Sequence, residues 1–149
     1  MRLLEQYREL QAQGKFPGLA MLPFVPDIAE LVNEFDSKTI LDYGCGLGFQ
    51  YTREKAYKAW GMKPPALYDP AVDRYSIKPE GQFDGVICTD VLEHVPADEL
   101  DAMVREIAGY ARQWAFVSVC QPSLDWWGAF LPPFFFGQRL VLRQSECPY

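Results

Sequence analysis

The chain has 149 residues, of which 49% are hydrophobic and 15% aromatic, and its formal net charge is -6 at pH 7. This length and composition predict one globular domain over residues 1–149 and argue against two domains or disorder. The negative charge disfavours nucleic acid and anionic membranes as partners, and no apolar stretch approaches the ~20 residues of a membrane span.

Cysteine usage and the N-terminus both favour a reducing compartment. The four cysteines are widely spaced without a C-x-x-C pair, and the chain has one histidine. A zinc site needs clustered ligands, so the residues alone predict no metal. The N-terminus is charged and amphipathic and lacks the apolar region of a signal peptide. We therefore expect a reduced, disulfide-free, cytoplasmic protein.

The N-terminal part (residues 1–36) is predicted to form two helices separated by an irregular lid. Apolar spacing predicts a helix over residues 2–13. Glycines and prolines then interrupt the segment 14–26, GKFPGLAMLPFVP. Pro26 suits the first turn of a second helix, which apolar spacing extends to Phe35.

Residues 38–120 are predicted to alternate between strands and helices. Four short apolar runs indicate buried strands at 39–44, 65–69, 83–90 and 114–120. A helix is predicted over 50–60, and a longer one begins near Ala97, where a proline and two acids suit a first turn. This alternation predicts an α/β fold, with a Rossmann-like, mostly parallel sheet and helices on both faces.

Residues 121–149 form an aromatic tail with two tryptophans, four phenylalanines and several prolines. Two strands are conceivable, at 128–136 and 139–144, although the prolines exclude a regular central strand. So many exposed aromatic side chains would be unusual for a monomer. The tail is therefore expected to cover the sheet, to contact a partner protein or a second copy in a homodimer, or to mark a truncated relative of the fold.

A glycine-rich turn after the first predicted strand carries the strongest functional signal. The sequence DYGCGLG (42–48) places glycines at alternate positions, where the backbone can turn sharply and approach a ligand. Parallel sheets bind ligands beyond the carboxyl ends of their strands, so a cofactor is expected here. The dinucleotide fingerprint G-x-G-x-x-G is not matched, because Phe49 occupies the last glycine position. This spacing disfavours a nicotinamide-dependent oxidoreductase.

The turn and the blocks that follow it resemble class I S-adenosylmethionine-dependent methyltransferases over about residues 38–120. The matching features are the glycine turn, Asp69 after the second strand, and FDGVICTDVLEHV (83–95). The resemblance implies S-adenosylmethionine as cofactor, with Asp42 facing its ammonium group and the glycines flanking its methionine part. A carboxylate at Asp69 can accept hydrogen bonds from both ribose hydroxyls. The expected cofactor-binding residues are Asp42, Tyr43, Gly44, Cys45, Gly46, Gly48, Asp69, Pro70 and Asp90.

Structural explanations stay open for several of these residues. The glycines could form only a tight connection, and Asp69 could cap a turn with Pro70, since Asp-Pro favours turn initiation. Cys45 fits the turn as a small residue rather than as a nucleophile, because nothing nearby in sequence would lower its pKa.

Asp90 and His94 are the candidate catalytic residues near the acceptor. An imidazole with an ordinary pKa of ~6.5 can take a proton from a hydroxyl or amine. Alternatively, Glu93 and His94 form a structural pair that ties the helix start to neighbouring loops. A resemblance to ubiquinone-type O-methyltransferases implies a third role, in which Asp90, Glu93 and His94 hold a divalent ion.

Two departures from the family pattern bear on function. Residues 70–82 are too few for the usual strand 3 unit, whose following acid contacts the adenine amine, so this region is expected to be shortened, with at most a rudimentary strand at 75–77. The tail matches the family's C-terminal helix and antiparallel pair poorly. The predicted function is methyl transfer from S-adenosylmethionine to a small-molecule acceptor, in a pocket closed by the lid and the tail. The alternative is a truncated or degenerate fold that serves as a non-catalytic cofactor- or protein-binding module.

Overall fold

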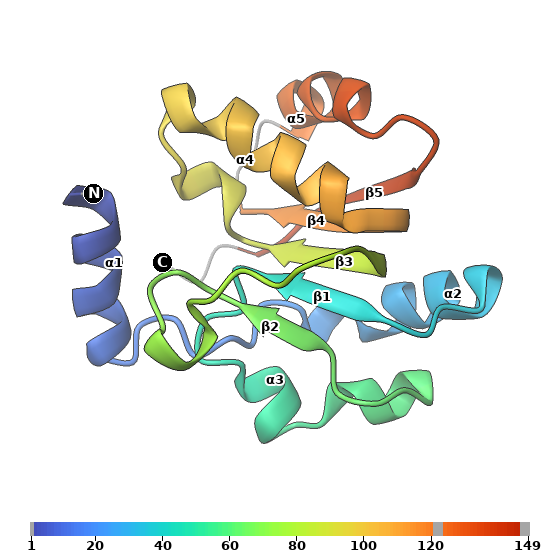
Figure 1. The fold of residues 1–149 in the computed structure, drawn as a ribbon, viewed down its shortest axis with the longest axis horizontal. Helices are drawn as coiled ribbons and strands as arrows, with labels where there is room; N and C mark the ends of the chain where they lie inside the picture. Colours follow the sequence, from blue (N-terminus) through green and yellow to red (C-terminus); the bar gives the residue numbers. More distant parts are fainter. Residues whose placement is uncertain (1, 121–123, 147–149) are drawn as a thin grey trace.

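Five strands form one sheet in the order β2-β1-β3-β4-β5, and every neighbouring pair is parallel (Figure 1). The computed structural model describes residues 2–120 and 124–146. The α/β class and the parallel sheet predicted from the sequence are confirmed. The strands are β1 Ile40–Tyr43, β2 Ala66–Tyr68, β3 Phe83–Thr89, β4 Ala111–Val119 and β5 Arg139–Gln144.

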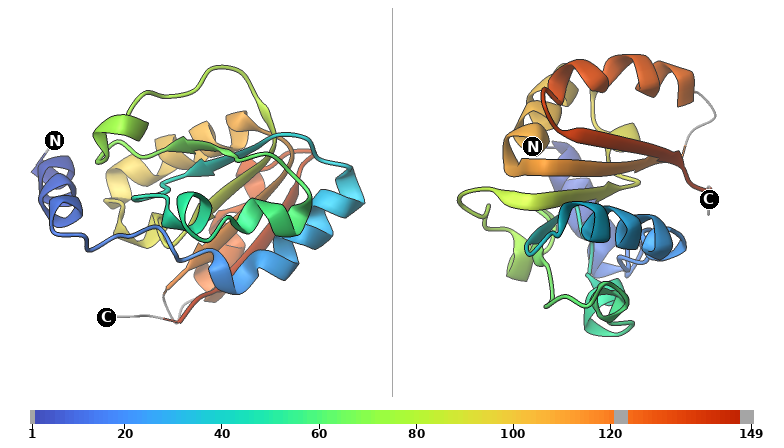
Figure 2. Two further views of the ribbon diagram at one scale, coloured as in Figure 1. Left: turned by 90° about the horizontal axis from the view of Figure 1, so that it is seen from below. Right: turned by 90° about the vertical axis from the view of Figure 1, so that its right-hand side faces the viewer.

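Helices cover both faces of the sheet, as predicted (Figure 2). α4 (Ala97–Tyr110) and α5 (Leu124–Phe130) lie on one face, and α2 (Val25–Phe35) and α3 (Phe49–Thr52) lie on the other. α1 (Arg2–Ala12) stands apart at the carboxyl ends of the strands (Figure 1). Short 3-10 turns complete the chain at Leu22–Phe24, Ala56–Trp60, Asp73–Tyr75, Leu92–His94 and Pro132–Phe134.

Alternating side chains along each strand build two cores, one on each face. Val86 and Cys88 of β3 join the cluster beneath α4 and α5, whereas Ile87 joins the cluster beneath α2. Trp114 and Phe116 of β4 are fully buried on the α2 face. Burial on both faces explains why these strands read as continuous apolar runs in the sequence.

Two local predictions between β1 and β3 are wrong. The helix predicted over 50–60 is interrupted at Lys55, whose φ of 50° is left-handed, so only α3 and a 3-10 turn form. No glycine marks this break, which leaves no sequence signal for it. The rudimentary strand at 75–77 is absent, and Asp73–Tyr75 forms a 3-10 turn instead. No strand lies between β2 and β3 among the described residues, which confirms the shortened region.

The aromatic tail covers the α4 face of the sheet. Trp127, Leu131 and Phe135 are buried in the cluster beneath α4. The strand expected at 139–144 forms as β5, but that at 128–136 is wrong, because these residues form the end of α5 and a 3-10 turn that starts on two prolines. The exposed large hydrophobic side chains among the described residues of the tail are Trp126, at 51%, and Phe136, at 96%.

Cysteine pairing differs from the disulfide-free expectation. Cys120 is disulfide-bonded. Cys45 and Cys88 are buried free thiols. Wide spacing in the sequence does not exclude a disulfide, because the tertiary fold decides which cysteines meet. Within 2–120 and 124–146, no helix is long and apolar enough to cross a membrane.

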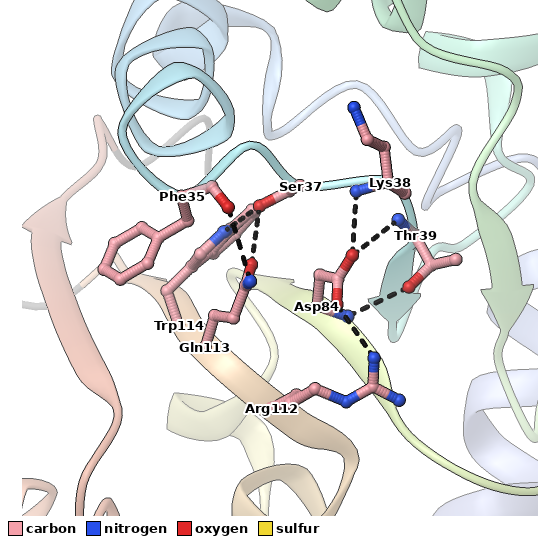
Figure 3. A network of polar contacts seen from close by, with 8 residues as sticks. All are labelled: Phe35, Ser37, Lys38, Thr39, Asp84, Arg112, Gln113 and Trp114. Atoms are coloured by element: carbon pink, nitrogen blue, oxygen red, sulfur yellow. Dashed lines mark hydrogen bonds and ion pairs between the residues drawn. The ribbon is translucent and has the colours of Figure 1, made fainter.

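A polar network fixes the amino ends of the strands, at the edge opposite α1 (Figure 3). Asp84 at the start of β3 accepts hydrogen bonds from the backbone amides of Lys38 (2.8 Å) and Thr39 (3.3 Å), and from the guanidinium of Arg112 (3.0 Å). Its own amide donates to the Thr39 hydroxyl at 3.0 Å. Further hydrogen bonds in this network join Phe35, Ser37, Gln113 and Trp114.

Candidate active site

A cavity of about 1070 Å³ lies at the carboxyl ends of the strands. Its walls include the glycine turn, the residues after β2, the residues after β3, α1 and the end of β5. Ligand pockets typically measure about 300–1,000 Å³. The volume is therefore large enough for a cofactor together with a small acceptor.

The glycine turn that follows β1 has a backbone that only glycine suits. Gly44, Gly46 and Gly48 have left-handed φ values of 84°, 59° and 71°. A Cβ on Gly44 would lie 2.4 Å from Val91 Cγ2, and one on Gly46 would lie 2.7 Å from the Phe16 carbonyl oxygen. Gly44 and Gly46 line the cavity, whereas Gly48 caps α3 beside it. Conformation and space therefore both exclude other side chains.

The predicted lid supports the glycine turn directly. The carbonyls of residues 16, 17 and 18 accept hydrogen bonds at 2.9–3.1 Å from the amides of residues 47, 49 and 50. A Cβ on Gly18 would lie 2.4 Å from the Cys45 carbonyl oxygen, so the two segments touch without spare room. Sequence reasoning predicted that this segment closes the pocket but missed its backbone pairing. Only the glycine at position 18 could have indicated it.

Asp42 lies beneath the turn rather than in the cavity wall. Its Oδ2 accepts hydrogen bonds from Gln50 Nε2 (2.6 Å) and from the Tyr51 hydroxyl. Its Oδ1 is buried and has no hydrogen-bond partner among the described residues. Complete burial raises the pKa of Asp42 to about 7, against the opposing effect of the Tyr51 and Gln50 hydrogen bonds. Gln50 lines the cavity and thus connects Asp42 to it, a role that the sequence analysis missed.

Asp69 caps its own turn, as one of the two open interpretations allowed, and it also holds the glycine turn, while ribose binding stays a prediction. Its Oδ2 accepts the Gly46 amide at 2.8 Å, which holds the glycine turn, and its Oδ1 accepts the Ala71 amide at 2.9 Å, which caps the Asp-Pro turn. Burial raises its pKa, and these two amides oppose that shift. Asp69 and Pro70 both line the cavity. A carboxylate has about four acceptor positions, so Asp69 retains capacity for ligand hydroxyls.

Tyr43 and Cys45 also line the cavity, with limited chemistry of their own. The Tyr43 ring packs against Tyr68, with ring centroids 5.1 Å apart. Burial raises the pKa of the Cys45 thiol far above its usual range. The expectation that Cys45 is a small turn residue rather than a nucleophile agrees with this environment.

Asp90 joins the ends of three strands at the cavity. It follows β3 with a left-handed φ of 56°. Its Oδ1 accepts hydrogen bonds from the hydroxyls of Ser118 in β4 (3.0 Å) and Ser145 after β5. Sequence reasoning missed both serines, because only the parallel pairing of β3, β4 and β5 brings them to Asp90.

Glu93 and His94 have different environments. Glu93 Oε1 accepts the Cys120 amide at 3.1 Å, and burial raises the Glu93 pKa to about 7. His94 lines the cavity beside Tyr7 and Phe16, and its Nε2 lies 3.9 Å from Glu93 Oε1. Burial lowers the His94 pKa despite the nearby Asp90, which favours a neutral imidazole at pH 7. Glu93 thus has a structural role, which the sequence analysis allowed for the Glu93–His94 pair. His94, in contrast, lines the cavity.

The divalent-ion role suggested for Asp90, Glu93 and His94 has no geometric support. Across residues 2–120 and 124–146, no three His, Cys, Asp or Glu side chains gather closely enough to hold a metal ion. The Asp90 and Glu93 carboxylates instead accept hydrogen bonds from hydroxyl and backbone groups.

A parallel α/β sheet, a glycine turn after its first strand and an acid after the next are the arrangement of class I methyltransferases. Comparison with known proteins shows the same family. A family model described as a methyltransferase domain matches residues 18–136, so the chain belongs to this family.

One curated relative is a magnesium-protoporphyrin O-methyltransferase from Synechocystis sp., which is 27% identical over 120 residues. The match covers 77% of this chain and 50% of that protein, so the chain spans about half the length of this relative. No solved structure gives a significant match. Neither the family model nor the relative points to a non-catalytic binding module.

Proposed function

We propose that this protein transfers a methyl group from S-adenosylmethionine to an oxygen atom of a small, largely apolar acceptor. One observation carries the proposal: a single cavity is lined both by the turn and acid expected to hold the cofactor and by the residues expected near the acceptor. The choice of oxygen is supported by the printed activity of the Synechocystis relative, an O-methyltransferase.

The cofactor end of the cavity suits S-adenosylmethionine chemically. When bound, this cofactor supplies a methyl group on a positively charged sulfonium, and the charge is lost on transfer. The backbone of Gly44 and Gly46 lines the cavity where the methionine part would lie, and the free acceptor positions of Asp69 suit its ribose hydroxyls. Asp42 acts from beneath by fixing Gln50 in the wall.

The acceptor end is formed by His94, Asp90 and apolar residues of α1 and the lid. A neutral His94 can accept the proton that an acceptor hydroxyl loses as its oxygen gains the methyl group. Tyr7 and Phe16 pack around the imidazole and limit its rotation, with ring centroids 6.4 Å from it in both cases. The main contribution of the protein is then to align the two reactants and to exclude water.

Calorimetric titration with S-adenosylhomocysteine tests the cofactor site. We expect wild-type protein to bind with a micromolar Kd and Asp69→Ala to bind at least tenfold more weakly. Gly46→Arg should lose binding because its side chain would collide with the Phe16 carbonyl and force the lid off the glycine turn. Gly61→Arg is the matched control, since Gly61 has a similar φ of 66° and nothing within 4 Å of its Cβ position. Failure of folded wild-type protein to bind would contradict the proposal.

The acceptor half is tested with His94→Gln in a methylation screen of small hydroxylated and carboxylated compounds. For a hydroxyl acceptor we expect kcat to fall by about 10²–10⁴-fold with unchanged S-adenosylhomocysteine affinity. Because the His94 pKa is lowered, wild-type kcat/KM should decline only at a pH below the ordinary histidine pKa of ~6.5. An unchanged kcat and pH profile in His94→Gln would exclude His94 as the base.

The same proposal places the protein in the cytoplasm, acting on a small molecule without nucleic acid or membrane as partner. The net charge of -6 supports this choice of partners. The disulfide at Cys120 weighs against a reducing compartment, since such bonds are rare there. Counting alkylated thiols in protein taken from cells without reductant tests this part.

A further inference from the structure

Part of the cavity wall is formed by residues of β2, of α4 and of the connection from β2 to β3, and we call this part the extension. Among the described residues this connection forms no strand, and it runs instead against the end of α4. Two hydrogen bonds fix it there, from the Tyr110 hydroxyl to the Pro79 carbonyl (2.8 Å) and from Gln82 Nε2 to the Gly109 carbonyl (3.1 Å). The residues that line the extension are Tyr43, Tyr68, Lys78, Ala102, Met103 and Glu106.

Glu106 has one carboxylate oxygen with a partner and one without. Its Oε2 accepts a hydrogen bond from Lys78 Nζ at 3.1 Å. Its Oε1 is buried and receives no hydrogen bond of good geometry from the described residues, although the Tyr43 hydroxyl lies close enough to Glu106 to act as a donor. A carboxylate oxygen is only an acceptor, and burying one without a donor is unfavourable. The complementary ligand group is therefore an N–H or O–H donor that enters the extension.

We propose that Glu106 accepts a hydrogen bond from the exocyclic amine of the cofactor's adenine, and that Lys78 positions its carboxylate. This inference rests on the proposed function. Asp69, which directly follows β2, would hold the ribose, to which the adenine is directly attached. Met103 in the extension and Pro70 next to Asp69 give the cavity apolar surface that suits a flat ring. Glu106 would thereby supply, from α4, the acid that is missing with the strand 3 unit.

A purely structural role for Glu106 is the competing explanation. Burial, followed by the charge of Glu106, raises the pKa of Tyr43, so these two side chains lie close together. Glu106 could then serve only to anchor Tyr43 and Lys78. The two explanations differ in ligand selectivity, because an anchor does not distinguish an amine from a carbonyl on a purine.

The test compares S-adenosylhomocysteine with S-inosylhomocysteine, in which a carbonyl oxygen replaces the amine. We expect wild-type protein to prefer the adenosyl ligand by about 50-fold, because the carbonyl would face the carboxylate. In Glu106→Gln the amide can donate to that carbonyl, so the preference should fall below about fivefold. Glu99→Gln is the matched control, since Glu99 lines the same cavity from an exposed position on α4. It should keep the wild-type preference.

Calorimetry and thermal unfolding together separate the outcomes. A preference that collapses only in Glu106→Gln supports the inference. Tight binding of S-adenosylhomocysteine with an unchanged preference in Glu106→Gln would overturn this inference but leave the proposed cofactor in place. If Glu106→Gln also had a lowered Tm, Glu106 would be an anchor for Tyr43 and Lys78. Absence of binding of either ligand to wild-type protein would overturn both this inference and the proposed function.

Discussion

Asp84 at the amino edge of the sheet and Asp42 near the carboxyl edge are both buried aspartates, but their surroundings differ. Both oxygens of Asp84 accept hydrogen bonds, from two backbone amides and an arginine. Asp42 satisfies one oxygen and buries the other without a described partner. Glu93 and Glu106, at or beside the cavity, repeat this half-satisfied pattern.

The difference separates a structural edge from a functional one. Buried polar groups are nearly always paired, so each unpaired one calls for an explanation. The groups around Asp84 at the amino edge satisfy one another and join the starts of β1, β3 and β4, although Gln138 Oε1, before β5, is buried without a described partner. At the carboxyl edge the unpaired oxygens and raised pKa values lower stability, and ligand binding can recover part of it. Variants at the two edges should therefore affect different measurements.

The largest effect on stability is expected for Asp84→Ala. Removing its carboxylate leaves the amides of Lys38 and Thr39 without their acceptor, which should lower the free energy of unfolding by about 3–4 kcal/mol. Urea denaturation measures this loss, and titration should show unchanged S-adenosylhomocysteine affinity for the folded fraction. Asp101→Ala, which removes an exposed ion pair with Arg105, should cost below about 0.5 kcal/mol. Equal losses of unfolding free energy in Asp84→Ala and Asp101→Ala would show that the polar network at the amino edge does not stabilise the fold more than an exposed ion pair does.

Gly18→Ala is expected to lower stability by less than Asp84→Ala does, but it should weaken ligand binding as well. Its Cβ would lie 2.4 Å and 2.5 Å from backbone atoms of Cys45 and Gly48, so the lid must move off the glycine turn. We expect a loss of about 3 kcal/mol and tenfold weaker S-adenosylhomocysteine binding. Gly14→Ala shares the strain of a positive φ, 71° against 78°, but has nothing within 4 Å of its Cβ position. It should cost about 1 kcal/mol without altering affinity. Equal affinities in both variants would show that the lid does not support the turn.

The smallest expected effect is a change in the pH dependence of stability. Folded Asp42 has a pKa of about 7 against 3.8 as its ordinary value, so between these values the native state holds a proton that the unfolded state lacks. Its contribution to stability is therefore present at low pH and is lost as pH rises towards 7. The difference in unfolding free energy between wild type and Asp42→Asn should fall by about 2 kcal/mol from pH 5 to pH 8.

Urea titrations at several pH values measure this difference. Glu93→Gln, which removes a second acid with a pKa of about 7, should give a similar change. If the unfolding free energies of wild type and Asp42→Asn change in parallel with pH, the buried carboxylate titrates normally. A raised pKa would then no longer distinguish the carboxyl edge from the amino edge.

The sequence was informative wherever a residue's type follows from its local backbone or burial. Alternate glycines at 42–48 predicted a sharp turn, and apolar runs predicted β1 to β4, because two-sided burial leaves no polar face. It was less informative where the chain breaks without a characteristic residue. Lys55 interrupts a predicted helix in a conformation that glycine normally takes, and the prolines after α5 suited a helical turn as well as a strand edge.

The sequence by itself therefore determined the class of the fold, the place of the glycine turn and most of the residues that line the cavity at the candidate site. Only the tertiary structure decided which groups meet there: the lid carbonyls with the glycine turn, Gln50 with Asp42, the two serines with Asp90, and Glu106 with the cavity. The physical reason is that backbone conformation and burial leave a local trace in residue type. A hydrogen bond between distant segments depends instead on strand order and on which helix covers which face, which no local pattern contains.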